Sequence, residues 1–232
     1  VILASTRDAD ETVKKVLQFS KKHKIDGVMT IANDVPYTVA RVADELHLPS
    51  ISVKAATLFS DKLLMKEAFV KNGVACPWFC DIENIEQVEE IVQDRLKQKY
   101  VLKPVDGRGA RGVLVIDENV DLPWAFNESM HYGESGRLIL EKFVEGVQLS
   151  TESFLFDGVC YTPSISERNY LRFDQFKPNI IEDGGTIPAK LSIDLLKKID
   201  DLILHGAKAL GVNHGLIKGD IVINRDGEPE II

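Results

Sequence analysis

A glycine-rich loop between two short apolar strands constrains the fold of this chain more than any other feature. Tyr100–Pro104 and Val113–Ile116 have the composition of strands, and residues 106–112 between them contain three glycines and two arginines. Because a strand follows the loop, it is not the turn that opens a helix in a dinucleotide-binding fold, and it also lacks the Gly-Lys-Ser/Thr of a P-loop. Glycine lets backbone N–H groups approach phosphate oxygens, and arginine adds charge-assisted donors. The loop therefore indicates either a phosphate-binding segment or a flexible hairpin tip.

Lys103 lies at the end of the strand that precedes this loop. A lysine among Val101, Leu102 and Val105 loses hydration unless an anion pairs with it, and a phosphate would be such an anion. The alternative is a lysine that extends its ammonium group to solvent at the strand end. A second segment, 140–146, passes from a strand into a charged hinge. Its backbone and carboxylates would suit the edge of a purine and the ribose hydroxyls, but an edge strand with solvated charges explains it equally well.

The rest of the chain predicts a mixed α/β fold. Residues 1–57 alternate apolar runs with amphipathic stretches, which is the pattern of a parallel sheet with helical crossovers. The strands expected there are 1–4, 25–31 and 48–51. Residues 60–98 have the periodicity of two helices, the second running through Leu96, and a long helix is expected over 192–210.

The C-terminal hairpin allows a specific prediction of register. Asp226-Gly227 between two apolar runs is a strong hairpin signal. With a two-residue loop, Asn224 faces Pro229 and Asp220 faces position 233, where a carboxylate would complete a two-oxygen clamp suited to Mg²⁺. A three-residue loop with a bulge at Gly227 would instead turn position 233 to the other face of the sheet.

Composition excludes several classes of protein. Of the 232 residues, 44% are hydrophobic and 28% are charged, which is ordinary for a globular protein and excludes a disordered chain. A net charge of −8 argues against a nucleic-acid partner, and no apolar run approaches the roughly 18 residues of a membrane span. Cys76, Cys80 and Cys160 fit no zinc pattern, so we expect reduced thiols in the cytoplasm. Both ends lie within strand-like runs, so we expect a piece of a longer protein.

Taken together and in order, these motifs resemble the ATP-grasp superfamily, most closely its carbamoyl-phosphate-synthase-like and carboxylate–amine ligase branches. The matching stretches are Ser60-Asp61-Lys62, Gly73-Val74, Val101–Pro104, 106–113, Glu141–Val144 with Gly146, Gly184–Pro188, and Gly215 followed by Asp220. The resemblance implies a partial Rossmann-like pre-ATP-grasp domain, followed by two α+β subdomains that hold ATP between them. The expected boundaries are 1–57 for the first domain, 58–99 for a helical linker, 100–140 for the small subdomain and 141–232 for the large one.

The same resemblance implies the site residues. Lys62 and Lys103 would contact the ATP phosphates, and the loop over them would be Gly107, Arg108, Gly109, Ala110, Arg111 and Gly112. The adenine hinge would be Glu141, Lys142, Phe143 and Val144, and Gln148 would stand where the family usually has a charged ribose-binding glutamate. Asp220 would be the first ligand of Mg²⁺ (or Mn²⁺), and Arg168 and Lys218 would contact the substrate or the γ-phosphate.

The activity implied by the resemblance is an ATP-dependent, ADP-forming ligase that activates a carboxylate as an acyl phosphate for attack by an amine. Its partners would be small-molecule carboxylate and amine substrates, without nucleic acid or membrane, and a homodimer is compatible with this family. The metal ligands expected beyond residue 232 and the uncharged Gln148 leave open an alternative, a non-catalytic ATP-binding module. A Rossmann-type dehydrogenase is disfavoured because its glycine-rich turn is missing.

Overall fold

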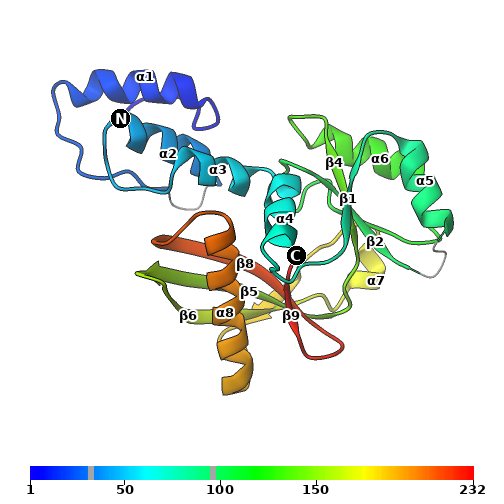
Figure 1. Cartoon of the computed structure of the whole chain (residues 1–232). Coiled ribbons are helices and arrows are strands. Elements are labelled where there is room, and N and C mark those ends of the chain that lie inside the picture. Colours follow the sequence, from blue (N-terminus) through cyan, green and yellow to red (C-terminus); the bar gives the residue numbers. More distant parts are fainter. Residues whose placement is uncertain (31–33, 95–97) are drawn as a thin grey trace.

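The computed structural model describes residues 1–30, 34–94 and 98–232 of the chain. Helices at the N-terminus lead into two antiparallel sheets, and helix α4 (Lys62–Lys71) lies between the sheets (Figure 1). The expected α/β class with two sheet-containing parts is confirmed. In the ranges given above, no helix combines the length and the apolar character needed to cross a membrane.

The N-terminal part is helical. Its elements are α1 (Ala9–Ser20), α2 (Pro36–Glu45) and α3 (Val53–Ser60). Helix α1 begins where the Asp8 carboxylate accepts a hydrogen bond from the backbone N–H of Glu11, and Pro36 occupies the first turn of α2. Helix α3 begins in the same way at Ser52, whose hydroxyl accepts from the N–H of Ala55.

The strands expected in this N-terminal part are wrong. None of the runs 1–4, 25–30 and 48–51 is a strand, and Ile31, the end of the second run, lies outside the described residues. Exposed backbone groups need a neighbouring strand to pair with, and Val1, Leu3 and Met29 stay largely exposed instead of packing in a sheet. The parallel sheet expected for residues 1–57 is therefore not found in the described part of the chain.

The smaller sheet has the strand order β1-β4-β2-β3, with every pair antiparallel. Its strands are β1 (Phe79–Ile82), β2 (Tyr100–Pro104), β3 (Leu114–Ile116) and β4 (Leu138–Lys142). Helices α5 (Ile85–Asp94) and α6 (Leu122–His131) pack against it, so that Val88 and Ala125 share a core with Tyr100 and Leu102. Strand β1 was not expected in the helical stretch 60–98, and Leu96, the expected end of α5, lies outside the described residues.

The larger sheet has the order β7-β6-β5-β8-β9 and is also antiparallel throughout. Its strands are β5 (Gly146–Phe156), β6 (Val159–Asn169), β7 (Gly184–Thr186), β8 (Gly215–Asn224) and β9 (Pro229–Ile231). Leu149, Leu155 and Ile221 point to the face that α8 (Ile193–Ala209) covers. Because side chains alternate along a strand, the neighbouring positions Gln148 and Asp220 point to the opposite face, toward the smaller sheet.

The C-terminal hairpin has the three-residue register. Ile223 pairs with Pro229, so Asn224 no longer faces Pro229 and the two-residue loop is wrong. Gly227 has φ 79°, which is the bulge position of the longer loop. The backbone N–H of Ile232 donates to the carbonyl of Asp220 at 3.0 Å, so residue 232, not position 233, lies opposite Asp220.

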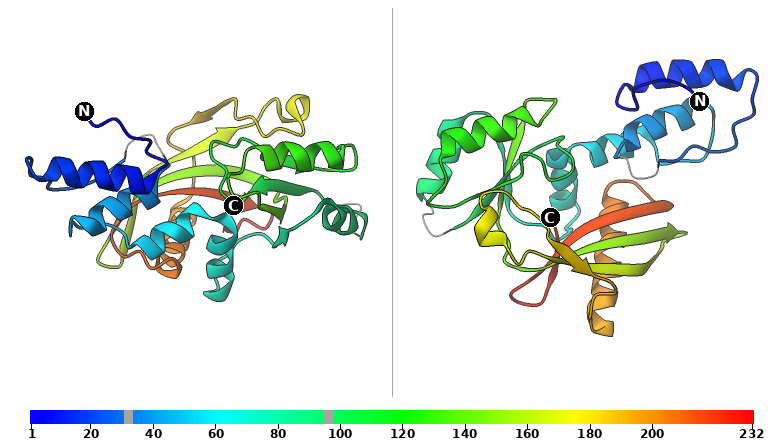
Figure 2. Two further views of the ribbon diagram at one scale, coloured as in Figure 1. Left: turned by 90° about the horizontal axis from the view of Figure 1, so that it is seen from above. Right: turned by 180° about the vertical axis from the view of Figure 1, so that it is seen from behind.

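Two segments connect the sheets. Asp61 starts α4 by accepting a hydrogen bond from Leu64 N–H at 2.9 Å, and its other carboxylate oxygen pairs with Arg137, which precedes β4, at 2.7 Å. On the other side, α7 (Phe173–Phe176) lies in the connection from β6 to β7, and the N–H of Val115 donates to the carbonyl of Pro178 at 2.8 Å. Figure 2 shows both segments between the sheets from two further sides.

Candidate functional site

A cleft of about 1300 Å³ lies between the two sheets. Its walls come from β2 and β4 of the smaller sheet, the glycine loop, α4, and the open face of the larger sheet. All the site residues expected from the sequence line it: Lys62, Lys103, Gly107, Arg108, Gly109, Ala110, Arg111, Gly112, Glu141, Lys142, Phe143, Val144, Gln148, Arg168, Lys218 and Asp220. The structure therefore brings together residues that are up to 158 positions apart in the chain, from Lys62 to Asp220.

Three lysines and one carboxylate form the inner end of this cleft. The ammonium groups of Lys66 and Lys103 both contact Oε2 of Glu141, at 3.1 and 2.9 Å. Burial raises the pKa of Glu141, but the two ammonium groups lower it by more, so the pKa lies below its ordinary value and the carboxylate is ionised. Lys62 also lies at this end, close enough to Glu141, Asp106 and Arg108 to interact with their charges, so that positive groups outnumber the carboxylates. Such an end of a cleft favours an anion.

This arrangement changes the role expected for Glu141. Its carboxylate, assigned from the sequence to adenine or ribose, is an ion-pair partner of two lysines in this structure, and Lys103 is therefore not an unpaired lysine. The other oxygen, Oε1, is buried and has no hydrogen-bond partner in the structure as described. Glu141 thus keeps one acceptor atom at the cleft wall while its charge is neutralised.

Lys62 is held by backbone carbonyl groups. Its ammonium group lies 2.6 Å from the carbonyl oxygen of Gly107, and 3.3 and 3.4 Å from those of Pro104 and Val105. Burial and, to a lesser extent, the positive charge of Lys103 together lower the pKa of Lys62 to about 8, against the opposing effect of Glu141. The side chain consequently titrates close to neutral pH, and a bound polyanion would favour its charged form.

This pKa predicts a pH dependence of anion binding. Lys62 loses its proton as the pH rises through about 8, so the affinity for ATP should fall by about tenfold between pH 8 and about 9.5 if the bound nucleotide keeps the lysine protonated. Calorimetric titration with ATP across this range measures the effect. The variant Lys62→Met should bind more weakly but with little change over the same pH range. A wild-type affinity that stays constant would contradict a lysine with a lowered pKa at the phosphates.

The glycine loop is fixed at its base and open at its tip. The Asp106 carboxylate accepts hydrogen bonds from the N–H groups of Glu134 and Ser135, at 3.2 and 2.8 Å, and the hydroxyl of Ser129 donates to the carbonyl of Gly112 at 2.8 Å. Residues 109–111 are exposed. A Cβ on Gly107 would lie 2.9 Å from Cγ of Pro104, so the close approach of this segment to β2 requires glycine.

The hinge after β4 is fixed by its backbone. The N–H groups of Lys142 and Phe143 donate to the carbonyls of Trp78 and Lys99, at 2.8 and 2.9 Å. The ring of Phe143 stacks on that of Phe173 from the opposite connection, with centroids 5.9 Å apart. Val144 follows between β4 and β5 and lines the cleft. A planar group that enters the cleft at this point would meet a fixed backbone edge.

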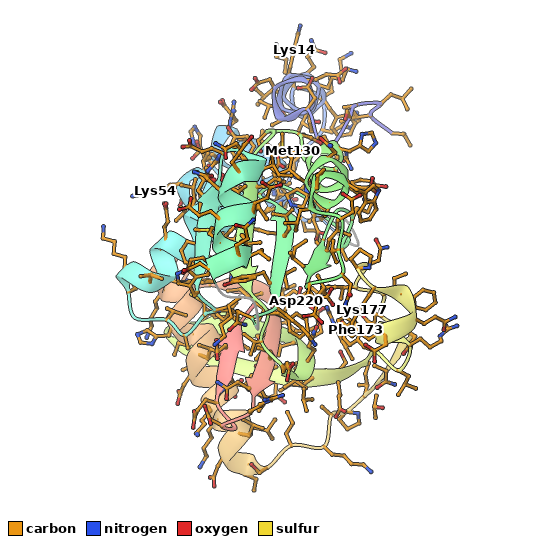
Figure 3. All side chains as sticks on the ribbon, turned by 90° about the vertical axis from the view of Figure 1, so that its right-hand side faces the viewer. Lys14, Lys54, Met130, Phe173, Lys177 and Asp220 are labelled. Atoms are coloured by element: carbon orange, nitrogen blue, oxygen red, sulfur yellow. The ribbon has the colours of Figure 1, made fainter. Side chains whose placement is uncertain are left out.

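The wall contributed by the larger sheet carries charges of both signs. Arg168 contacts Asp220 at 2.6 Å through Nη2 and Glu182 at 3.5 Å through Nε. Lys218 lies two residues before Asp220 on β8 and is opposite Glu152 of β5 in the strand register. In Figure 3, Asp220 lies between the two sheets, and Phe173 and Lys177 lie in the connection from β6 to β7. Asp220 is thus held by an arginine in this structure.

One member of the site was missed in the sequence. Lys66 is fully buried beside Glu141, although nothing in its immediate neighbourhood marks it as functional. The signal was its spacing: Lys66 follows Lys62 by four residues, which places both on one face of α4. Because Lys62 faces the cleft, a buried lysine one turn later needs an anion, and β4 supplies it.

Comparison with known proteins identifies the family. A model of the ATP-grasp domain matches residues 59–232. The chain is 28% identical over 201 residues to a D-alanine--D-alanine ligase of Gloeobacter violaceus, covering 82% of this chain and 63% of that protein. A D-alanine--D-alanine ligase of Bordetella avium is 23% identical over 221 residues, covering 93% of this chain and 64% of that protein. The chain thus spans less than two thirds of the length of these relatives.

Solved structures show the same fold. The L-amino acid ligase from Bacillus licheniformis has a TM-score of 0.80 at 22% identity, covering 100% of this chain and 54% of that one. N5-carboxyaminoimidazole ribonucleotide synthetase, solved as an ADP complex, has a TM-score of 0.75 at 20% identity, covering 100% of this chain and 57% of that one. At this level of identity the likeness concerns the fold alone. The family model, which covers most of the chain, shows that this chain belongs to the ATP-grasp domain family.

Proposed function

We propose that this chain is the nucleotide-binding part of an ATP-dependent, ADP-forming ligase that joins a carboxylate to an amine. The observation that carries the proposal is the inner end of the cleft, where Lys66 and Lys103 contact the carboxylate of Glu141 and Lys62 lies against the base of the glycine loop. A triphosphate supplies the negative charge that this end lacks, and the fixed hinge at Phe143 and Val144 suits the edge of its base. Membership of the ATP-grasp family and the ligases among the relatives support the same activity.

The proposed reaction has two steps. A carboxylate oxygen of the first substrate attacks the γ-phosphorus of ATP, the bond from that phosphorus to the β–γ bridging oxygen breaks, and ADP leaves. The amine of the second substrate then attacks the carbonyl carbon of the acyl phosphate, loses a proton and releases phosphate. The protein contributes mainly position and charge: Lys62 and Lys103 stabilise the negative charge on the phosphates, and the loop 107–112 covers them.

A divalent cation fits this site to a limited extent. The described residues contain no group of three His, Cys, Asp or Glu side chains placed to hold a metal. Mg²⁺, however, is commonly bound by one or two carboxylates together with substrate phosphates, and Asp220 offers one carboxylate at the cleft wall. When bound, Mg²⁺ would neutralise phosphate charge. In the structure Arg168 holds Oδ1 of Asp220, so binding of the cation requires this arginine to move or the other oxygen to be used.

The substrates that we propose are small molecules of the amino acid class, because relatives include D-alanine--D-alanine ligases and an L-amino acid ligase. Arg168 and Lys218 are positively charged side chains on the cleft wall formed by the larger sheet, and we assign the substrate carboxylate to them. A cytoplasmic location and a homodimer are part of the same proposal. The division into segments 1–57, 58–99, 100–140 and 141–232 is likewise retained as a proposal.

The test is product formation by the protein that contains this chain. We expect release of ADP and phosphate that requires Mg²⁺ and both an amino acid carboxylate and an amine. A panel of single amino acids and pairs, assayed by phosphate release and mass spectrometry of the product, measures it. ATP binding without substrate-dependent turnover would favour the alternative of a non-catalytic module, for which Gln148 in place of a ribose-binding glutamate is the supporting observation.

The substitution Asp220→Asn separates metal binding from nucleotide binding. We expect it to reduce Mg²⁺-dependent turnover by about 100-fold or more, because an amide is a poor ligand for this cation, but to change ATP affinity without Mg²⁺ by only a few fold. Turnover at increasing Mg²⁺ and calorimetry in the presence of a chelator measure the two effects. An equal loss in both measurements would argue against a metal role for Asp220.

A further inference from the structure

We propose that Lys66 is a positioning residue of the nucleotide site: it neutralises Glu141, so that Lys103 keeps its charge for the nucleotide phosphates. This inference rests on the proposed function and deepens it. Lys66 is not assigned by the sequence motifs. It lies one turn after Lys62 in α4, the helix that lies between the two sheets in Figure 1.

Lys66 is more deeply buried than Lys103, as a role behind Glu141 requires. The side chain of Lys66 is 1% exposed and that of Lys103 is 13% exposed, although both contact the same oxygen of Glu141. The ammonium group of Lys66 is also 3.3 Å from the carbonyl oxygen of Ile231. Both lysines line the cleft, but Lys66 is enclosed by these protein contacts, whereas part of the Lys103 side chain stays accessible. Lys66 is placed to act through Glu141 rather than on a ligand.

The charges explain why a second lysine is needed. An ionised carboxylate at this depth requires a cation, because an uncompensated buried charge is strongly unfavourable. If Lys103 were its only partner, the pair would be neutral and Lys103 would be held against Glu141. With Lys66 present, Glu141 is neutralised from the buried side. The net positive charge of Lys62 and Lys103 is then available to an anion in the cleft.

Lys66 also connects the smaller sheet to the larger one. Glu141 lies on β4 and Ile231 on β9, and the N–H of Ile231 donates to the carbonyl of Ala75 at 3.0 Å. A purely structural role for Lys66 is the competing explanation. The two explanations differ in the ligand: a loss of structure weakens every ligand of the cleft, whereas a loss of charge weakens a tetra-anion far more than a neutral nucleoside.

The experiment compares ATP with adenosine. Calorimetry gives the two dissociation constants for the wild type and for Lys66→Met. We expect Lys66→Met to weaken ATP about tenfold or more and adenosine by less than about threefold, so that the preference for ATP falls. Lys71→Met, a substitution of an exposed lysine at the end of the same helix, serves as the matched control and should leave both constants unchanged.

A double variant makes the test sharper. In Lys66→Met/Glu141→Gln both members of the buried pair have lost their charge, so Lys103 is released and the preference for ATP over adenosine should recover. ATP and adenosine carry the same base, so any effect of Glu141→Gln on the base would be common to both ligands and would leave the ratio interpretable. A ratio that stays at the wild-type value in Lys66→Met, or that fails to recover in the double variant, overturns the role of Lys66. A wild type that does not prefer ATP to adenosine overturns the proposed function itself.

Discussion

Replacing Glu141 with glutamine is expected to lower the free energy of unfolding by about 3–5 kcal/mol, because it removes the carboxylate that pairs with the buried Lys66 and with Lys103. The amide has nearly the same shape, so little packing is lost. Lys66, however, would remain 1% exposed without a counter-ion. Breaking a buried pair in this way costs more than the pair itself contributes, since the remaining charge has lost its water and its partner. Urea denaturation at neutral pH measures the change.

The loss of stability in Glu141→Gln should become smaller as the pH rises. Without Glu141, burial would push the pKa of Lys66 in the folded state well below that of the unfolded chain. The folded state then binds fewer protons than the unfolded state, so the stability deficit is largest at low pH and becomes smaller as the pH rises through the folded pKa. Adding Lys66→Met to Glu141→Gln should restore part of the stability at neutral pH.

Glu145→Gln is the matched control. Glu145 lies four residues after Glu141 and also has two cationic partners, Lys99 and Arg225. It is exposed, however, and exposed ion pairs contribute about 0–1 kcal/mol. If Glu141→Gln and Glu145→Gln cost the same, the cluster around Glu141 does not carry the buried charges described here.

The parts of this fold that the sequence predicted are those with local causes. Asp61 before Lys62 and Ser192 before Ile193 cap their helices, and each accepts the hydrogen bond that a helix start requires. The glycine loop lies between two strands, as its spacing indicated. The three N-terminal strands failed because a run of about four apolar residues forms a strand only beside another one, and that neighbour is a property of the whole fold.

The sequence left the length of the C-terminal hairpin loop open, and in the structure one side chain decides it. Asn224-Arg225-Asp226-Gly227 allows either a two-residue or a three-residue loop. In the structure Oδ1 of Asn224 accepts hydrogen bonds from the N–H groups of Asp226 and Glu228, both at 3.0 Å, and its backbone N–H donates to the carbonyl of Glu228. This side-chain turn closes the longer loop, so that Asp220 lies opposite Ile232.

The sequence predicted most residues of the candidate site but not which of their charged groups pair with one another. Lys62, Lys103 and Glu141 could be named from motifs, because each motif is contiguous. That Glu141 pairs with Lys66 and Lys103 depends on how α4, β2 and β4 pack together, and no spacing along the chain encodes it. The sequence therefore suggested a carboxylate for the nucleotide base where the structure has a neutralising group between two lysines.

Replacing Lys103 with methionine is expected to weaken ATP binding by about 10- to 100-fold, the value of one charge-assisted hydrogen bond to a phosphate. Lys103 is the lysine of the Glu141 cluster that remains open to the cleft, while Lys66 continues to neutralise the carboxylate in the variant. The protein should therefore stay folded, with a smaller loss of stability than Glu141→Gln. Calorimetry with ATP, ADP, AMP and adenosine measures the effect along a series of decreasing charge.

The series identifies the group that Lys103 contacts. A contact with the β- or γ-phosphate predicts a large loss for ATP, a smaller one for ADP or AMP, and almost none for adenosine. Lys99→Met is the control, because Lys99 lies just before the same strand but pairs at the surface with Glu145, 3.8 Å away. An equal loss for all four ligands would mean that Lys103 supports the shape of the cleft and not the phosphates, and the anion-binding end would then reduce to Lys62 and the glycine loop.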